Sequence, residues 1–200
     1  MLQLADKKPL ANGGERLVFE HPEHDEWLVK VANPHSKKSK RPQPFYKRLR
    51  RLGPFQPTGQ EVLEHMALRV TCPERPKDWT HVQNIIGFAD TDMGLGIVVE
   101  AVRGANGDLA PTLRQLHQDG RLDDHVIDGL EQFFDWLLHS KVIINDLHLD
   151  NLVLSQSGRV VMIDGLGDRH LIPIKAYSQR FNRHHKQKKI ERLRQKLGLS

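Results

Sequence analysis

The chain has 200 residues, 38% of them hydrophobic and 28% charged, which suits one domain with a real core and excludes a disordered chain. No apolar run reaches the roughly 18 residues that a membrane-spanning helix needs, and the N-terminal residues lack the apolar segment of a signal peptide. The single cysteine, Cys72, excludes an internal disulfide and fits a reducing compartment, so we expect a cytoplasmic protein.

The net charge of +5 is unevenly distributed. Residues 35–51 contain eight Lys or Arg and no acid, and residues 175–197 contain nine Lys or Arg and one acid. The remaining residues include 13 bases and 24 acids, a net charge of −11. Localised charge of this kind attracts anionic partners, or the acidic body of the same chain.

The first hundred residues predict a strand-rich region. Turn-forming residues at 22–25 separate two runs of β-forming residues, which is the pattern of a hairpin. A segment rich in Pro, Lys and Arg, 33–59, predicts a loop or insert, and apolar spacing over 60–70 predicts a helix. The predicted strands are 16–21, 26–31, 85–88 and 94–102.

The following residues predict helices around one short hairpin. Residues 123–140 carry the broad apolar stripe of a buried helix. The other elements expected here are a short helix at 111–118, a hairpin of 152–154 with 160–163, and a basic helix from about Pro173 to Leu197. A region of strands followed by a region of helices indicates an α+β fold with two lobes.

We therefore expect a single domain over residues 1–200 with three parts. Residues 1–102 would form a β-rich N-terminal lobe, with 33–59 as its basic insert. Residues 103–172 would form a minimal helical C-terminal lobe, and residues 173–200 a basic C-terminal helix.

Three polar residues stand out around the predicted hairpin. Asp146 and Asn151 are five positions apart on a predicted loop, and Asp164 follows one hairpin later. The hairpin would fold Asp164 back beside Asn151, so that oxygen atoms from two loops converge. Such a set suits Mg²⁺, a hard cation that prefers oxygen ligands. A carboxylate that orients a hydroxyl, together with an amide and a carboxylate that hold metal on ATP, is the polar core of a kinase site.

On these residues the chain resembles the protein-kinase-like superfamily, and more narrowly the bacterial PhoP regulatory network protein (YrbL) family. The resemblance extends over roughly residues 2–185. The segments that carry the narrower resemblance are Pro9-Leu10, His21-Pro22-Glu23, Val29-Lys30-Val31, Lys77-Asp78-Trp79, and Asp164-x-x-Gly167 running on to Leu171-Ile172-Pro173. It implies a two-lobed kinase-like fold with a truncated helical lobe, and a role in a bacterial envelope-stress or low-Mg²⁺ regulon.

The resemblance also implies an ATP- and Mg²⁺-dependent phosphotransferase whose acceptor, a small molecule or a protein, is unknown. Asp146 would accept the proton of the acceptor hydroxyl, while Asn151 and Asp164 would hold Mg²⁺. Lys30 would contact the ATP phosphates, held by Glu61 on the following helix, with Glu64 as the alternative partner.

The remaining positions of the resemblance concern the nucleotide. Asn12, Gly13 and Gly14 lie where a glycine-rich loop covers phosphates, because glycine lets backbone N–H groups approach closely. Backbone groups of Glu100 and Val102 would meet the adenine at the hinge.

The chain departs from typical protein kinases at several of these positions. Ile144 and Asn145 replace the His-Arg pair before Asp146, and His148 replaces a lysine that neutralises the transferred phosphate. Because His is neutral near pH 7 more often than Lys, we expect a lower rate than in kinases with the full motif set. Only 36 residues follow Asp164, too few for a full activation segment and lower lobe, so a peptide substrate is not favoured.

Other interpretations stay open at this point. The altered motifs also fit a nucleotide-binding regulatory module of the pseudokinase type, without useful transfer. The basic tail fits a solvated helix face, or a surface that binds RNA, an acidic lipid or an acidic protein. His148 with Asp150 could suggest a transition-metal site, but neither a second histidine at ligand spacing nor a cysteine accompanies them.

Overall fold

The computed structural model describes residues 1–35, 56–71, 79–167 and 178–199. The chain divides into two compact units. Unit 1 comprises Met1–Gly59 and Asn84–Ala101, and unit 2 comprises Gln60–Gln83 and Val102–Ser200. Across the described residues, none of the helices is long and apolar enough to cross a membrane.

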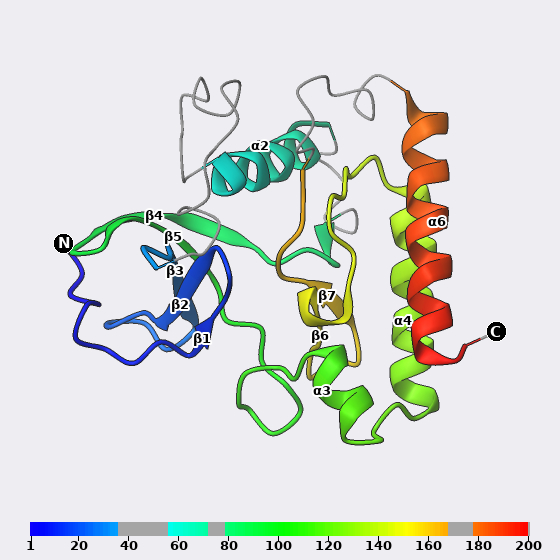
Figure 1. Ribbon diagram of the computed structural model, residues 1–200, viewed down its shortest axis with the longest axis horizontal. Helices are drawn as coiled ribbons and strands as arrows, with labels where there is room; N and C mark the ends of the chain where they lie inside the picture. The colour runs from blue at the N-terminus through cyan, green and yellow to red at the C-terminus, as the bar shows by residue number, and fades with distance from the viewer. Residues whose placement is uncertain (36–55, 72–78, 168–177, 200) are drawn as a thin grey trace. The chain divides into compact units, whose positions relative to one another are not determined.

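Unit 1 is built on an antiparallel sheet of five strands in the order β1-β2-β3-β5-β4 (Figure 1). The strands are β1 (Ala11–Asn12), β2 (Arg16–Glu20), β3 (Trp27–Ala32), β4 (Ile85–Thr91) and β5 (Gly94–Glu100). Alternating apolar residues of β2 and β3 point to one face, where Phe19, Val29 and Val31 pack with Leu4 and Leu17. Lys30 lies between these positions, opposite Val18 on one side and Ile97 on the other.

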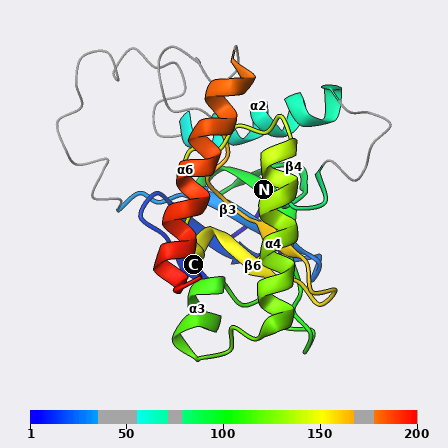
Figure 2. The ribbon, with the colours of Figure 1, turned by 90° about the vertical axis from the view of Figure 1, so that its right-hand side faces the viewer.

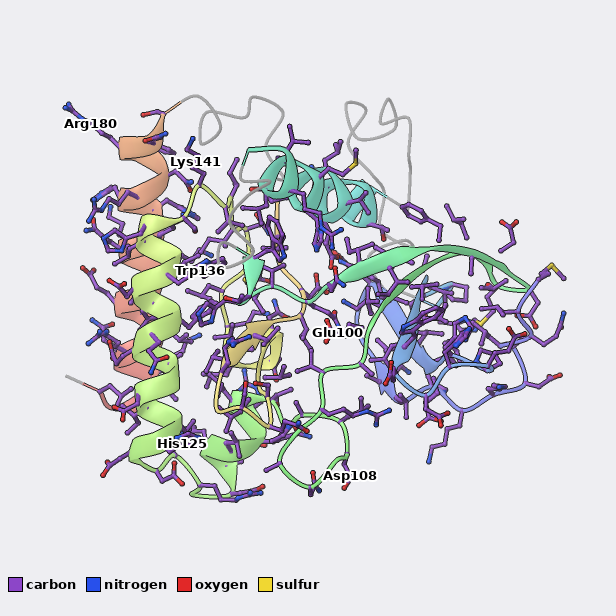
Figure 3. The ribbon with its side chains drawn as sticks, turned by 180° about the vertical axis from the view of Figure 1, so that it is seen from behind. Glu100, Asp108, His125, Trp136, Lys141 and Arg180 are labelled. Atoms are coloured by element: carbon purple, nitrogen blue, oxygen red, sulfur yellow. The ribbon has the colours of Figure 1, made fainter. Side chains whose placement is uncertain are left out.

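Unit 2 carries the helices and one small hairpin. Its elements are α2 (Gln56–Thr71), whose first residues fall in unit 1, α3 (Leu113–Gln118), α4 (Asp124–His139), the 3-10 turn η3 (Leu149–Asn151), β6 (Leu152–Leu154), β7 (Val160–Met162) and α6 (Gln179–Leu197). The apolar stripe of α4 forms the centre of the core, with Phe133, Phe134 and Leu137 fully buried. Trp136 lies on the same helix (Figure 3). The centroid of its ring is 5.1 Å from that of the His81 ring.

Capping residues set the ends of these helices. Thr112 and Gln115 form a capping box at the start of α3, and the Asp123 side chain accepts from the backbone N–H of Val126 at the start of α4. Ser178 caps α6 in the same way, and Gly198 ends it in the left-handed conformation. The sequence therefore determines where each of these helices begins.

α6 packs antiparallel along α4 rather than extending into solvent, as Figure 2 shows. Lys141, just after α4, and Arg180, near the start of α6, lie at the same end of the pair (Figure 3). Ile190 and Leu193 enter the core of unit 2, and Arg194 forms an ion pair with Glu131 of α4. The interpretation of the tail as a solvated face is therefore wrong for this side of the helix.

Lys186 fixes this packing from inside the core. Its side chain is 1% exposed, and its Nζ donates to the backbone oxygens of Leu137 (2.7 Å) and Ser140 (2.8 Å). These carbonyls belong to the end of α4, where helix carbonyls lack intrahelical partners and where a cation is favourable. Asn182, one turn earlier on α6, donates to the Val142 oxygen at 3.1 Å.

The α+β class and the element order expected from the sequence are confirmed. All four predicted strands, the three earlier helices and the hairpin are present, with ends that differ by a few residues. The helix predicted over 60–70 begins at Gln56, inside the segment assigned to the basic insert. Residues 36–55 of that insert and the predicted helix start at Pro173 lie outside the described residues.

Candidate active site

The loop before the hairpin, residues 144–151, is joined to the segment that follows it. Ile144 forms an antiparallel bridge with Leu166. The backbone N–H groups of Asn145 and Asp146 both donate to the Gly165 oxygen, at 2.8 and 3.1 Å. The backbone of Asp146 is therefore held against the residue that follows Asp164.

The hairpin then brings Asp164 back beside Asn151. β6 pairs with β7 so that Leu152 faces Met162, and the Ile163 N–H donates to the Asn151 oxygen at 2.9 Å. Asn151 Nδ2 in turn donates to the backbone oxygen of Asp146 at 3.0 Å. Asp146, Asn151 and Asp164 thus come together in unit 2, as their spacing indicates.

These side chains offer oxygen to a cation. Because the Nδ2 end of the Asn151 amide is bound to the Asp146 oxygen, its Oδ1 is the end left to act as a ligand. The Asp164 carboxylate is half-buried, and its Oδ1 accepts from the Gly165 N–H at 2.6 Å. Amide and carboxylate oxygens form a donor set that fits Mg²⁺.

Gly165 is required by this arrangement. Its φ is +93°, and a Cβ at this position would lie 2.3 Å from the Asp146 oxygen and 2.9 Å from Asn151 Nδ2. Glycine alone combines this conformation with such close backbone contact. The glycine directly after Asp164 therefore has a packing reason.

His148 lies between two carboxylates. Its Nε2 is 3.3 Å from Asp146 Oδ2, and its Nδ1 is 3.5 Å from Asp150 Oδ2 without hydrogen-bond geometry. Arg114 of α3 donates from Nε to Asp150 Oδ1 at 2.5 Å, and this hydrogen bond holds the pKa of the Asp150 carboxyl below its usual value. The Arg114–Asp150 pair could not be predicted from local sequence, because the two residues are 36 positions apart.

The described side chains do not support a transition-metal site. Within residues 1–35, 56–71, 79–167 and 178–199, no group of three or more His, Cys, Asp or Glu side chains is placed to hold a metal ion. His148 and Asp150 are instead part of the polar arrangement around Asp146 and Arg114.

The two predicted charged partners are both buried, each in its own unit. Lys30 of β3 is 7% exposed, and Glu61 of α2 is 4% exposed. Charged side chains are seldom buried without a function or a partner. Glu64, the alternative partner, accepts from the Ile143 N–H at 2.6 Å and so supports the segment before the loop.

The candidate phosphate-covering turn ends β1. The Gly13 N–H donates to the Arg16 oxygen at 2.9 Å, and Asn33 Nδ2 donates to both Asn12 Oδ1 (3.1 Å) and the Gly13 oxygen (3.0 Å). The residues of this turn, Gly14 included, are exposed. Asn33, which the sequence alone did not single out, thus closes the turn.

The candidate hinge begins at Glu100, the last residue of β5. The Glu100 N–H donates to the Asn84 oxygen at 3.0 Å, and the Val102 oxygen accepts from the Ala110 N–H at 2.9 Å. The backbone between them is continuous from unit 1 into unit 2. These hydrogen bonds use one backbone group of each candidate hinge residue.

A family model, PhoP regulatory network protein YrbL, matches residues 2–198. The YrbL proteins of Escherichia coli (strain K12) and Shigella flexneri are each 23% identical over 186 residues, which is 90% of this chain and 80% of theirs. A putative ribosomal protein S6 kinase alpha-2 of Caenorhabditis elegans is 35% identical over 108 residues, 54% of this chain and 14% of that protein.

Two solved structures are similar to this chain. Monomeric WbdD is 14% identical with a TM-score of 0.46, over 75% of this chain and 32% of that chain. The apo form of PpkA-294 is 16% identical with a TM-score of 0.46, over 78% of this chain and 56% of that chain. The chain therefore spans about a third to just over half of these solved chains.

Proposed function

The chain belongs to the PhoP regulatory network protein YrbL family, and from this premise we propose that it transfers the γ-phosphoryl group of ATP to an acceptor hydroxyl in the presence of Mg²⁺. The observation that carries the proposal is the assembly of Asp146, Asn151 and Asp164 by the loop and the hairpin. A kinase-like site needs these residue types at this spacing. With one cysteine, and with ATP as the donor, we propose that the protein acts in the cytoplasm.

In the proposed reaction the acceptor oxygen attacks the γ-phosphorus. A new P–O bond forms, the bond from the γ-phosphorus to the β–γ bridging oxygen breaks, and ADP leaves with that electron pair. The hydroxyl proton passes to the Asp146 carboxylate. Asn151 and Asp164 would hold Mg²⁺, which neutralises phosphate charge when bound. Catalysis then rests on position and charge, without a covalent intermediate.

For the ATP phosphates we propose two further residues. Lys30 would meet the α- and β-phosphates, and Glu61 would orient it. Burial of Lys30 suits this role, because a desolvated ammonium group interacts strongly with phosphate.

The turn of Asn12, Gly13 and Gly14 would cover the phosphates, with Asn33 holding it closed. For adenine we propose backbone groups of Glu100, the last residue of β5, and of Val102.

His148 would act beside Asp146. In its protonated form the imidazole would neutralise the transferred phosphate, and its Nε2 lies close enough to Asp146 to fix that carboxylate.

The test is the steady-state turnover of MgATP by the wild type and Asp146→Asn. We expect the substitution to lower turnover at least about 100-fold, the lower bound of a general-base contribution. Asp128→Asn, an exposed carboxylate on α4, is the matched control and should turn over as the wild type does. Unchanged turnover in Asp146→Asn would refute the role of Asp146. MgATP binding with no phosphate release or transfer would leave the regulatory, pseudokinase-type module.

A further inference from the structure

α6 places positive charge next to the candidate catalytic loop. A pocket of about 420 Å³ lies between this helix and the loop. Asp146, Leu147 and His148 line one side. The residues of α6 that line the other side are Lys189, Arg192, Leu193, Gln195 and Lys196.

The three cations of this wall, Lys189, Arg192 and Lys196, form a stripe on one side of the helix. Positions i, i+3 and i+7 of a helix share a face, so their side chains stand one above another. We call these three residues the cationic stripe. It is anchored to the loop by Lys189, whose Nζ donates to the Asn145 backbone oxygen at 3.0 Å.

The stripe differs from the cations that hold α6 in place. Lys186 and Arg194 are occupied by the α4 carbonyls and by Glu131. Among residues whose contacts the structure describes, Arg192 and Lys196 have no carboxylate partner, and both are exposed. Two exposed cations on a pocket wall, neither of them held in an ion pair, favour an anion there.

We propose that the acceptor is a hydroxyl compound that carries a phosphate monoester, bound with its phosphate on the cationic stripe and its hydroxyl at Asp146. The identification of this hydroxyl as the reacting group rests on the proposed function. A phosphate monoester offers three oxygens and up to two negative charges to Arg and Lys donors. The pocket volume lies in the range of small-molecule sites, which favours a small compound over an RNA chain.

In the reaction the hydroxyl of this compound becomes a second phosphate ester. Its oxygen bonds to the γ-phosphorus, ADP departs, and the proton goes to Asp146, while the phosphate on the stripe is unchanged. The product carries two phosphates.

The first experiment measures binding without ATP. Isothermal titration would compare matched pairs, glycerol with glycerol 3-phosphate and glucose with glucose 6-phosphate, and also inorganic phosphate. We expect the phosphorylated member of each pair to bind at least about tenfold more tightly. Arg192→Gln and Lys196→Gln should each weaken phosphate binding about tenfold, as the loss of a charged hydrogen bond does. The control is Lys188→Gln, an exposed α6 residue outside the pocket wall, which should bind as the wild type does.

The proposal would be overturned if neither inorganic phosphate nor either phosphorylated compound bound, or if the two members of each pair bound equally well. It would also be overturned if Arg192→Gln and Lys188→Gln lost the same affinity for phosphate. If the two variants instead lost the same affinity for an RNA oligonucleotide, and sugar phosphates did not bind, the result would indicate general attraction of anions by the basic helix.

A second experiment tests whether the phosphate monoester belongs to a soluble compound or to a lipid. It measures binding to phosphatidylcholine vesicles that contain phosphatidic acid. Vesicle binding that Arg192→Gln lowers, without binding of the soluble compounds, supports a lipid-borne phosphate monoester.

Thermal stabilisation by MgATP, measured on the same samples, separates this proposal from the proposed function. Phosphate binding that depends on Arg192, without stabilisation by MgATP, would refute the kinase function and leave the anion pocket. Stabilisation by MgATP without phosphate binding at the stripe would refute the anion pocket and leave the kinase function.

Discussion

Replacing Gly165 by alanine tests how the candidate site is built. At φ +93° any side chain is strained, and left-handed backbone costs an L-residue about 1–2 kcal/mol. The added Cβ would also lie 2.3 Å from the Asp146 oxygen and 2.9 Å from Asn151 Nδ2. Overpacking of this kind costs about 1–3 kcal/mol more. We therefore expect Gly165→Ala to lower the free energy of unfolding by about 2–5 kcal/mol.

Gly107→Ala is the matched control. Gly107 has a similar φ of +83°, but a Cβ there would meet nothing within 4 Å. This variant should lose only the conformational cost, about 1–2 kcal/mol. The difference between the two variants, about 1–3 kcal/mol, measures the contact of residue 165 with the loop.

Urea denaturation followed by far-ultraviolet circular dichroism gives both free energies of unfolding. Because the Asp146 backbone must move to make room for a Cβ, MgATP turnover should fall strongly in Gly165→Ala and be retained in Gly107→Ala. Equal losses of stability in the two variants would refute the account of the loop.

Two further predictions concern buried titrating groups of unit 2. Burial lowers the pKa of Lys186 to about 8, so between about pH 8 and 10.5 the unfolded chain binds a proton that the folded chain has released, and stability rises with pH. From pH 8 to 9.5 the free energy of unfolding of the wild type, measured by urea denaturation, should rise by up to about 2 kcal/mol relative to that of Lys186→Met. No rise would contradict the burial of the Lys186 ammonium group. Burial also lowers the pKa of His81, whose Nδ1 lies 2.8 Å from the Val160 oxygen. The contribution of neutral His81 to stability is complete above about pH 6.5 and is lost as the pH falls. An NMR titration of the His81 ring should therefore give a midpoint below 6.5, and a midpoint at or above 6.5 would contradict the lowered pKa.

The sequence predicts the local parts of this fold well. The spacing of Asp146, Asn151 and Asp164 indicates that Asp164 returns beside Asn151. A short hairpin has one favoured register, the one that turns the apolar residues of both strands to the core. The apolar stripe and the capping residue of α4 likewise define that helix from neighbouring residues alone. The roles of the three polar residues in catalysis stay predictions.

Contacts between residues far apart in the chain could not be predicted from the sequence. Nothing near Glu64 shows that it binds the Ile143 N–H, 79 positions away. The charge of α6 suggested a solvated helix, because a buried lysine at position 186 is unusual unless distant carbonyls are known to surround it. The cationic stripe appears only once α6 is seen beside the loop.

The most direct test of the proposed function is a thermal-shift titration with ATP, with and without Mg²⁺, on wild type and Asp164→Asn. A ligand that binds only the folded state stabilises it by mass action, by about 2.7 kcal/mol at 100 times its dissociation constant. We predict a Mg²⁺-dependent rise in the melting temperature of the wild type that Asp164→Asn abolishes. An absent shift, or the same shift in the variant, would contradict the assignment of Asp164 as a metal ligand in a nucleotide site.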